Sequence, residues 1–177
     1  MTRFILLLRG VNVGGVKLNM AEFRDYLAGL GFENVQTYVQ SGNAVFTSDL
    51  ADCEAVRAKA SEGLLAAFGF QPQIMVLTAG ELREAIRANP YPLAVSEPTS
   101  LHLGFMQSEP AQTAIELLKL KPNAGEQWTV MGKLFYLHSP LGMGKSVLAP
   151  FIERTLKVPV TMRNWNTVIA LAEMAGQ

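Results

Sequence analysis

The sequence is poor in the residues that most directly indicate a chemistry. It has one cysteine, Cys53, so it can form neither a disulfide framework nor a cluster of thiolate metal ligands. The acidic neighbours Asp52 and Glu54 raise the pKa expected of that thiol, which favours a packing role over a reactive one. No segment approaches the ~20 apolar residues of a membrane span, and Phe4–Leu8 is too short for a signal-peptide core. These absences predict a cytoplasmic protein that does not enter a membrane.

An excess of charge of either sign is also missing. Fifteen basic and fifteen acidic side chains cancel, which argues against a general binder of nucleic acid or anionic membranes. The acidic residues are unevenly spread, however: none precedes Glu22, and Glu153 is the only one between Glu126 and Glu173. These two windows hold most of the glycine-rich turns, and their cations include Arg9, Lys17, Lys133, Lys145, Arg154, Lys157 and Arg163. We therefore expect a locally positive surface where the fold gathers these loops.

The usual catalytic groups are absent too. His102 lies in an expected strand, where a core or edge histidine is more common than a general base, and His138 lies nearer a glycine-rich loop. No His, Cys, Asp or Glu spacing resembles a metal site, and no G-x-S-x-G elbow offers a serine nucleophile. The sequence assigns no catalytic residue, metal ligand or cofactor, and its candidate loops carry groups that bind and polarise.

What is present is enough apolar chain to build a core. With 177 residues, 49% of them hydrophobic, the chain can form one large domain or two small ones. Apolar runs, helical periodicity and capping residues in the first half predict the order strand, helix, hairpin, helix, strand. The expected elements are Phe4–Leu8, a helix from Asn19 to Leu30, the hairpin Val35–Val39 with Ala44–Thr47, a helix from Asp49 to Phe68, and Gln73–Leu77.

The second half repeats this order after a linker-like, proline-rich stretch. Its expected elements are the strand Leu101–Met106, a helix after Pro110, the hairpin Gln127–Val130 with Leu134–Leu137, the helix Val147–Leu156, the strand Val158–Thr161 and a last helix capped by Asn164. A further helix capped by Thr78 follows the first half. The order β-α-β-β-α-β predicts an α+β fold of two ferredoxin-like halves, each with an appended helix. We place the first subdomain at residues 1–90 and the second at residues 99–177.

Two candidate ligand-binding segments lie in the first half. Residues 9–15 (RGVNVGG) join a strand to a helix, and Arg9 and Asn12 could give a phosphate or carboxylate bidentate donors and an orienting amide. In the hairpin turn, Ser41 and Asn43 would place a hydroxyl and an amide beside that loop. Each segment also has a structural interpretation, a tight connection in the first case and a turn that needs glycine at Gly42 in the second.

Two more candidates lie in the second half. Residues 142–146 (GMGKS) lack the glycine spacing of a nucleotide-binding P-loop, but Lys145 and Ser146 would lie at a helix N-terminus that can hold a phosphate. Beside Asn164, Arg163 would bind an anion while Trp165 stacks on a base or ring. The structural interpretation makes Asn164 a helix N-cap and Trp165 part of the core.

These motifs together resemble a known bacterial family. The resemblance rests on residues 7–15 (LLRGVNVGG), 20–22 (MAE), 38–46 (YVQSGNAVF), 134–137 (LFYL), 142–146 (GMGKS) and 161–168 (TMRNWNTV). They are similar to the uncharacterised family called domain of unknown function 1697, over nearly the whole chain. The resemblance implies a two-part α+β fold with ferredoxin-like halves, and it implies no activity.

Three functional hypotheses remain open. The first is a cytoplasmic binding module for a phosphate-bearing ligand, either a nucleotide or a short single-stranded nucleic acid. The second is an enzyme on a small anionic substrate, with Arg9, Lys145 and Arg163 stabilising charge and His138 carrying protons. In the third, the polar loops are structural and dock the two halves or a second subunit, which includes a homodimer.

Overall fold

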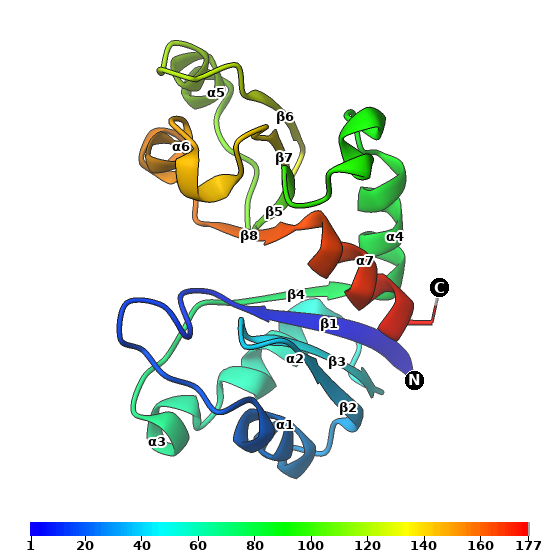
Figure 1. Ribbon diagram of the computed structural model, residues 1–177. Helices are drawn as coiled ribbons and strands as arrows, with labels where there is room; N and C mark the ends of the chain where they lie inside the picture. The colour runs from blue at the N-terminus through cyan, green and yellow to red at the C-terminus, as the bar shows by residue number, and fades with distance from the viewer. Residues whose placement is uncertain (177) are drawn as a thin grey trace. The chain divides into compact units, whose positions relative to one another are not determined.

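The computed structural model describes residues 1–176. Packing groups these residues into two compact units, unit 1 (Met1–Glu84 and the segment from Ile169 on) and unit 2 (Ala85–Val168). Each contains a four-stranded antiparallel sheet with helices, which confirms the predicted α+β class and is consistent with two ferredoxin-like halves (Figure 1). Whether residues 1–90 and 99–177 behave as separate domains stays a prediction.

Unit 1 is built on a sheet with strand order β2-β3-β1-β4. Its elements are β1 (Thr2–Leu8), α1 (Met20–Gly29), β2 (Glu33–Tyr38), β3 (Asn43–Ser48), α2 (Cys53–Ser61), α3 (Leu64–Phe68), β4 (Ile74–Thr78) and the greater part of α4 (Ala79–Arg87). β1 is antiparallel to both β3 and β4. The ends of the sheet are therefore fixed: the loop after β1, the β2–β3 turn and the loop before β4 lie at the same end.

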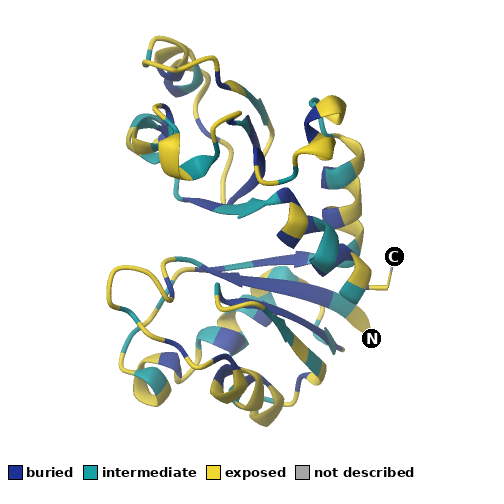
Figure 2. Ribbon diagram, viewed as in Figure 1, coloured by how far each residue is buried: buried dark blue, intermediate teal, exposed yellow. Residues whose placement is uncertain are grey.

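The core of unit 1 follows from the apolar alternation of β1. Phe4, Leu6 and Leu8 pack with Phe23 and Leu27 of α1 on one face of the sheet, where they join the main hydrophobic cluster. Ile5 and Leu7 point to the opposite face and are also buried, so β1 is a strand buried on both sides (Figure 2). A continuous apolar run is what such a strand requires, and the sequence prediction of a buried first strand is confirmed.

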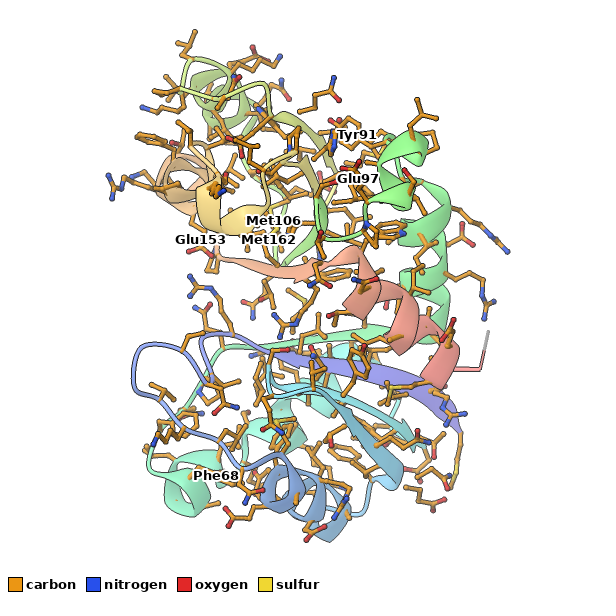
Figure 3. The ribbon with its side chains drawn as sticks, in the orientation of Figure 1. Phe68, Tyr91, Glu97, Met106, Glu153 and Met162 are labelled. Atoms are coloured by element: carbon orange, nitrogen blue, oxygen red, sulfur yellow. The ribbon has the colours of Figure 1, made fainter. Side chains whose placement is uncertain are left out.

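Unit 2 repeats the topology with strand order β6-β7-β5-β8. Its elements are η1 (Pro92–Ser96), β5 (Leu101–Met106), α5 (Gln112–Lys119), β6 (Gln127–Met131), β7 (Leu134–His138), η2 (Met143–Lys145), α6 (Ala149–Leu156), β8 (Val160–Asn164) and the start of α7 (Trp165–Met174). Leu118, Ile152 and Leu156 pack from the helices on Met106 of β5 and Val160 of β8. Met106 and Met162, labelled in Figure 3, come from the adjacent strands β5 and β8.

Several predicted boundaries differ from the structure. The single helix expected from Asp49 to Phe68 is two helices, because Asp52 is the N-cap of α2 and Gly63 adopts a left-handed φ of 79° between α2 and α3. The helix expected from Val147 begins at Ala149, with Pro150 in its first turn as predicted. The last strand runs to Asn164 rather than Thr161. The predicted caps are confirmed: Asn19 accepts from the backbone N–H groups of Ala21 and Glu22.

Candidate functional site

The predicted loop after β1 is held in shape by one side chain. The Asn12 amide nitrogen donates to the carbonyls of Leu18 and Gln40, and its oxygen accepts from Leu18 N at 2.8 Å. Its backbone N–H donates to Val16 O at 2.8 Å, and its φ of 55° is left-handed, a conformation that asparagine tolerates. Asn12 therefore clamps the loop to itself and to the β2–β3 turn, and its amide is committed to the fold rather than to a ligand.

The hairpin turn packs directly against this loop. Leu8 N donates to Gly42 O at 2.7 Å, and a Cβ at Gly42 would lie 2.6 Å from Val11 Cγ2 and 2.7 Å from Leu8 Cβ. Only glycine fits this approach. Asn43 is fully buried and donates to Tyr38 O and Ser41 Oγ, so it stabilises the turn. The structure thus brings together the two segments that the sequence predicted to be neighbours.

A third segment completes this end of the sheet, and the sequence analysis did not identify it. Arg9 N donates to Gln73 O at 3.0 Å, and the Arg9 guanidinium lies 3.5 Å from Gln73 Oε1, which places the loop before β4 beside the loop after β1. We call residues 9–18, 39–42 and 69–73 the unit 1 loop cluster. Segments 1–21, 34–48 and 63–78, which contain it, have no aspartate or glutamate. The sequence alone shows that these three segments lack carboxylates. Only the strand order of the sheet shows that they meet at one surface.

The exposed groups of the unit 1 loop cluster are cationic or neutral. Lys17 is exposed and Arg9 is partly exposed. Gly14 and Gly15 are exposed with left-handed φ values of 60° and 91°, and an added Cβ would meet nothing within 4 Å at either position. Their backbone is therefore open to solvent at a positively charged surface. Such a loop can bring N–H groups and cations close to an anion.

The second predicted anion site, at the start of α6, is filled by the protein itself. The buried Glu126 carboxylate accepts from Val147 N at 3.0 Å and from Leu148 N at 2.9 Å. Burial raises the pKa of Glu126, but hydrogen bonds from the Ser146 hydroxyl, Leu148 N, the Ser139 hydroxyl and Val147 N outweigh it and hold this pKa below its usual range. The donors that were predicted to receive a phosphate here already hold a carboxylate.

Ser146 and Lys145 lie just before α6. Ser146 Oγ accepts from Ala149 N at 2.9 Å, so its hydroxyl oxygen caps the helix. Lys145 ends the short 3₁₀ turn η2 and is exposed. With Glu126 in place and Ser146 capping, Lys145 is the candidate of this pair that faces solvent.

The last candidate segment is mostly part of the core. Trp165 is 3% exposed and its backbone N–H donates to Pro98 O, so its ring offers no face to a stacking base. Asn164 Oδ1 accepts from Thr167 N at 3.0 Å, which confirms its prediction as the N-cap of α7. Arg163 donates to Met162 O at 2.8 Å, and burial lowers its pKa to about 10. The predicted base-stacking role of Trp165 is therefore wrong, because tertiary packing uses the indole as a core side chain.

The remaining titratable groups do not assemble a catalytic centre. Burial lowers the pKa of His102, which stays neutral inside sheet β6-β7-β5-β8. Burial, followed by the neighbouring Glu81 carboxylate, raises the pKa of Cys53 to about 12, as expected for a packing thiol. Among residues 1–176, no group of three His, Cys, Asp or Glu side chains is placed to hold a metal ion. In the same residues, no helix has the length and apolar character needed to cross a membrane.

Comparisons with known proteins support the fold and give no activity. A family described as "Protein of unknown function (DUF1697)" matches residues 1–136. A solved structure, "The structure of conserved bacterial protein SP0830 from Streptococcus pneumoniae", is similar over 100% of this chain and 99% of its own, with 27% sequence identity and a TM-score of 0.75. No curated protein shows significant similarity.

Proposed function

The chain belongs to the DUF1697 family, whose function is unknown, and from that premise we propose that its unit 1 loop cluster binds a phosphate-bearing ligand. The ligand class is a nucleotide or a short single-stranded nucleic acid. The observation that carries the proposal is the meeting of three carboxylate-free segments at one end of the sheet, with Arg9 and Lys17 among them. The chain as a whole has no net charge, so this local imbalance is a property of the fold.

The cations of the unit 1 loop cluster supply the electrostatic attraction. A guanidinium can give a phosphate two parallel, charge-assisted hydrogen bonds. One nitrogen of the Arg9 guanidinium lies 3.5 Å from Gln73 Oε1, which helps to orient this side chain at the end of the sheet. Since Lys17 is exposed, its attraction for an anion is screened by salt, and binding is expected to weaken as ionic strength rises.

Preorganisation supports the same proposal. Asn12 and Gly42 fix the shape of the loop from below through bonds to Leu18 and Gln40 and through packing on Leu8. The ligand therefore does not have to order the loop, which reduces the entropic cost of binding. The backbone of this loop is open at Gly14 and Gly15, where a ligand can approach it.

Binding is favoured over catalysis because the cluster contains no imidazole or carboxylate. The enzyme hypothesis placed His138 as a proton carrier, and this histidine lies on β7 in unit 2 with its ring 6.2 Å from that of Tyr91. The unit 1 loop cluster itself offers cations, amides, a hydroxyl and backbone groups, so the class of function that it supports is recognition.

The test is a thermal-shift screen of the full chain against nucleotides, phosphosugars, inorganic phosphate and short oligonucleotides. A ligand at one hundred times its dissociation constant adds about 2.7 kcal/mol. For a chain of this length that raises the melting temperature by roughly 5–10 °C. Arg9→Ala and Lys17→Ala should each reduce the shift, while Arg24→Ala, on the exposed face of α1, should leave it unchanged.

Two results would contradict the proposal. A panel that produces no shift at low salt would favour the docking hypothesis for these loops. A ligand whose affinity is the same in Arg9→Ala, Lys17→Ala and Arg24→Ala would bind elsewhere. For an oligonucleotide, a shallow salt dependence would also contradict it, because phosphate contacts make affinity fall steeply with salt.

A further inference from the structure

Unit 2 contains a groove that none of the functional hypotheses uses. Its volume is about 600 Å³ and it is open to solvent. Three residues of α5 that recur at helical spacing form one wall, and Tyr91, labelled in Figure 3 in the segment before η1, stands at the other side. The full lining is Tyr91, Gln112, Ile115, Lys119, Glu126, Gln127, Trp128, Thr129 and Val130.

The lining shows that the groove runs along the edge of strand β6. Gln127, Trp128, Thr129 and Val130 are consecutive, and successive side chains of a strand point to opposite faces of the sheet. A cavity over one face would contact every second residue. Trp128 and Val130 pack with the core on the helix side, while Thr129 Oγ1 meets the Tyr91 hydroxyl at 2.8 Å on the other. The groove therefore straddles the outer edge of β6.

This edge lacks the features by which proteins normally block edge strands. The β6–β7 register is continuous from residue 127 to residue 131, and β6 contains no charged residue and no proline. In residues 1–176, no element other than β7 forms a backbone hydrogen bond with β6. The matching edge strand of unit 1, β2, is blocked: it carries Glu33, an irregular register between Glu33 and Gln36, and a left-handed Asn34.

The elements beside the groove also expose apolar surface. Leu93 is 90% exposed in η1, Leu117 is 54% exposed in α5, Leu120 is 80% exposed at the end of α5, and Met131 is 43% exposed in β6. In β2 and α1, which are the counterparts in unit 1, no large hydrophobic residue is exposed to this degree, and Val39, directly after β2, is 51% exposed. Of the four in unit 2, Met131 belongs to the open strand itself, so it adds an apolar side chain to the edge that a second chain would cover.

The hairpin turn determines which backbone groups face outward. β6 and β7 are joined by two residues, with Met131 paired to Leu134, so the closing pair is hydrogen-bonded and the bonding alternates along the ladder. The N–H and C=O groups of Met131, Thr129 and Gln127 then point to β7. Those of Trp128 and Val130 point into the groove, two residues apart, where another strand can pair with them.

We propose that β6 pairs antiparallel with β6 of a second copy of this chain, about a two-fold axis at Thr129. In this register Trp128 of one copy exchanges both hydrogen bonds with Val130 of the other, and the symmetric pair does the same, so all outward groups are satisfied. The two four-stranded sheets of unit 2 join into one of eight strands. The groove of each copy receives the β6 strand of the other.

The side chains of β6 complement themselves in this register. Trp128 lies opposite Val130 of the second copy on the helix side, an aromatic and β-branched pair that stabilises neighbouring strands, and Thr129 lies opposite Thr129. No like charges face each other, because β6 has none, and the chain has a net charge of zero, which permits self-association. A charged peptide would find no charged partner on β6 itself, and this favours a second copy as the occupant.

The first test measures the mass of the full chain by sedimentation velocity over a hundredfold concentration range. The wild type should sediment as a dimer and dissociate on dilution. Val130→Pro removes the outward N–H without breaking a bond to β7, so it should shift the dissociation constant at least tenfold toward monomer. Val130→Thr keeps that N–H and the β-branched shape, and should remain dimeric with the same circular dichroism spectrum.

The second test uses charge to identify the two-fold axis. Thr129→Lys and Thr129→Glu should each be monomeric, because like charges would meet at the axis, and an equimolar mixture should form a dimer. A general loss of structure cannot produce this rescue. A wild type that is monomeric at every concentration would overturn the proposal. So would a dimer that both Val130→Pro and Thr129→Lys leave intact, since it would use another surface.

Discussion

The two units share one topology, and they differ in two corresponding regions: the loop end of the sheet and the outer edge strand. At the loop end of the sheet, unit 1 has eleven residues between β1 and α1 (residues 9–19), with no carboxylate. Unit 2 has five residues between β5 and α5 (residues 107–111), including Glu109, whose Oε1 lies 3.5 Å from a Cβ placed at Gly132 of the hairpin turn. Unit 2 therefore carries an acidic side chain where unit 1 has an open cationic surface.

At the edges of the sheets the contrast is reversed, since unit 1 has the blocked surface and unit 2 the open one. The β2 edge of unit 1 is blocked by an irregular register and a charged residue, whereas the β6 edge of unit 2 is regular and uncharged. Each unit thus has one surface available and the other one closed. We infer that the repeated fold divides two tasks, with anion recognition in unit 1 and self-association in unit 2.

The largest loss of stability is expected from removing the buried Glu126 carboxylate of unit 2. Glu126→Ala leaves the backbone N–H groups of Val147 and Leu148 without their acceptor at the start of α6. The loss of two charge-assisted bonds in a buried place should cost about 3–4 kcal/mol of unfolding free energy. Urea denaturation checks this, with the exposed Glu109→Ala as control. Equal midpoints for the two variants would show that Glu126 does not hold the helix.

The same carboxylate predicts an acid dependence. Because its folded pKa is held below the ordinary value, Glu126 contributes stability that is complete above the unfolded pKa of about 4.3 and is lost as pH falls through the folded pKa. Glu126→Gln has no carboxylate to take up a proton, so the fall in its stability below about pH 5 should be shallower than in the wild type. Parallel curves for the two proteins would contradict this origin of the acid sensitivity.

The next effect tests the close contact under the unit 1 loop cluster. Gly42→Ala places a Cβ within 2.7 Å of atoms of Val11 and Leu8 at a φ of +74°, and should cost on the order of 3 kcal/mol. Gly69→Ala is the matched control, since its φ is +76° and an added Cβ meets nothing within 4 Å. It should lose only about 1–2 kcal/mol. If Gly42→Ala and Gly69→Ala lose the same free energy of unfolding, the left-handed backbone rather than close packing explains the need for glycine at position 42.

A smaller effect is expected for the asparagine clamp. Asn12→Ala removes three side-chain hydrogen bonds, to Leu18 N, Leu18 O and Gln40 O, and should cost about 1–2 kcal/mol while it abolishes ligand binding. Asn34→Ala is its control, because Asn34 has a φ of 53° like the 55° of Asn12 but a single side-chain bond, to Thr47. Calorimetric titration with any ligand from the screen separates the two. Wild-type affinity in Asn12→Ala would contradict preorganisation.

The sequence predicted the fold because its signals are local. Apolar runs, Asn19 and Thr78 as helix caps, and Gly42 in a hairpin are each sufficient to place an element, and the repeated element order then implies two sheets. The break between α2 and α3 was missed because both sides of Gly63 keep helical spacing. The left-handed backbone of Gly63 interrupts the helix at this point, and the spacing of apolar residues does not reveal it.

The candidate site was only partly predictable because its partners are distant in the sequence. The proximity of Arg9 to Gln73 depends on the pairing of β1 with β4, and the pairing of Glu126 with the start of α6 spans 22 residues. Polar motifs were visible, but whether Ser146 or Trp165 faces solvent depends on burial, which no spacing shows. A motif indicates which groups are present, and the fold decides which of them remain available.

The smallest effect concerns Val39, at the exposed edge of the unit 1 loop cluster. Its φ of 47° is left-handed, which a β-branched residue adopts only at a cost, and its side chain is 51% exposed. Val39→Asn should therefore stabilise the protein by about 1 kcal/mol, as measured by thermal and urea unfolding. The short turn of unit 2 avoids this cost with Gly132 at a φ of 57°. An unchanged or lower stability would show that Val39 packs better than its exposure implies. If stability rises while ligand affinity falls, the strain is retained for an apolar contact with the ligand, which would favour a nucleoside over inorganic phosphate.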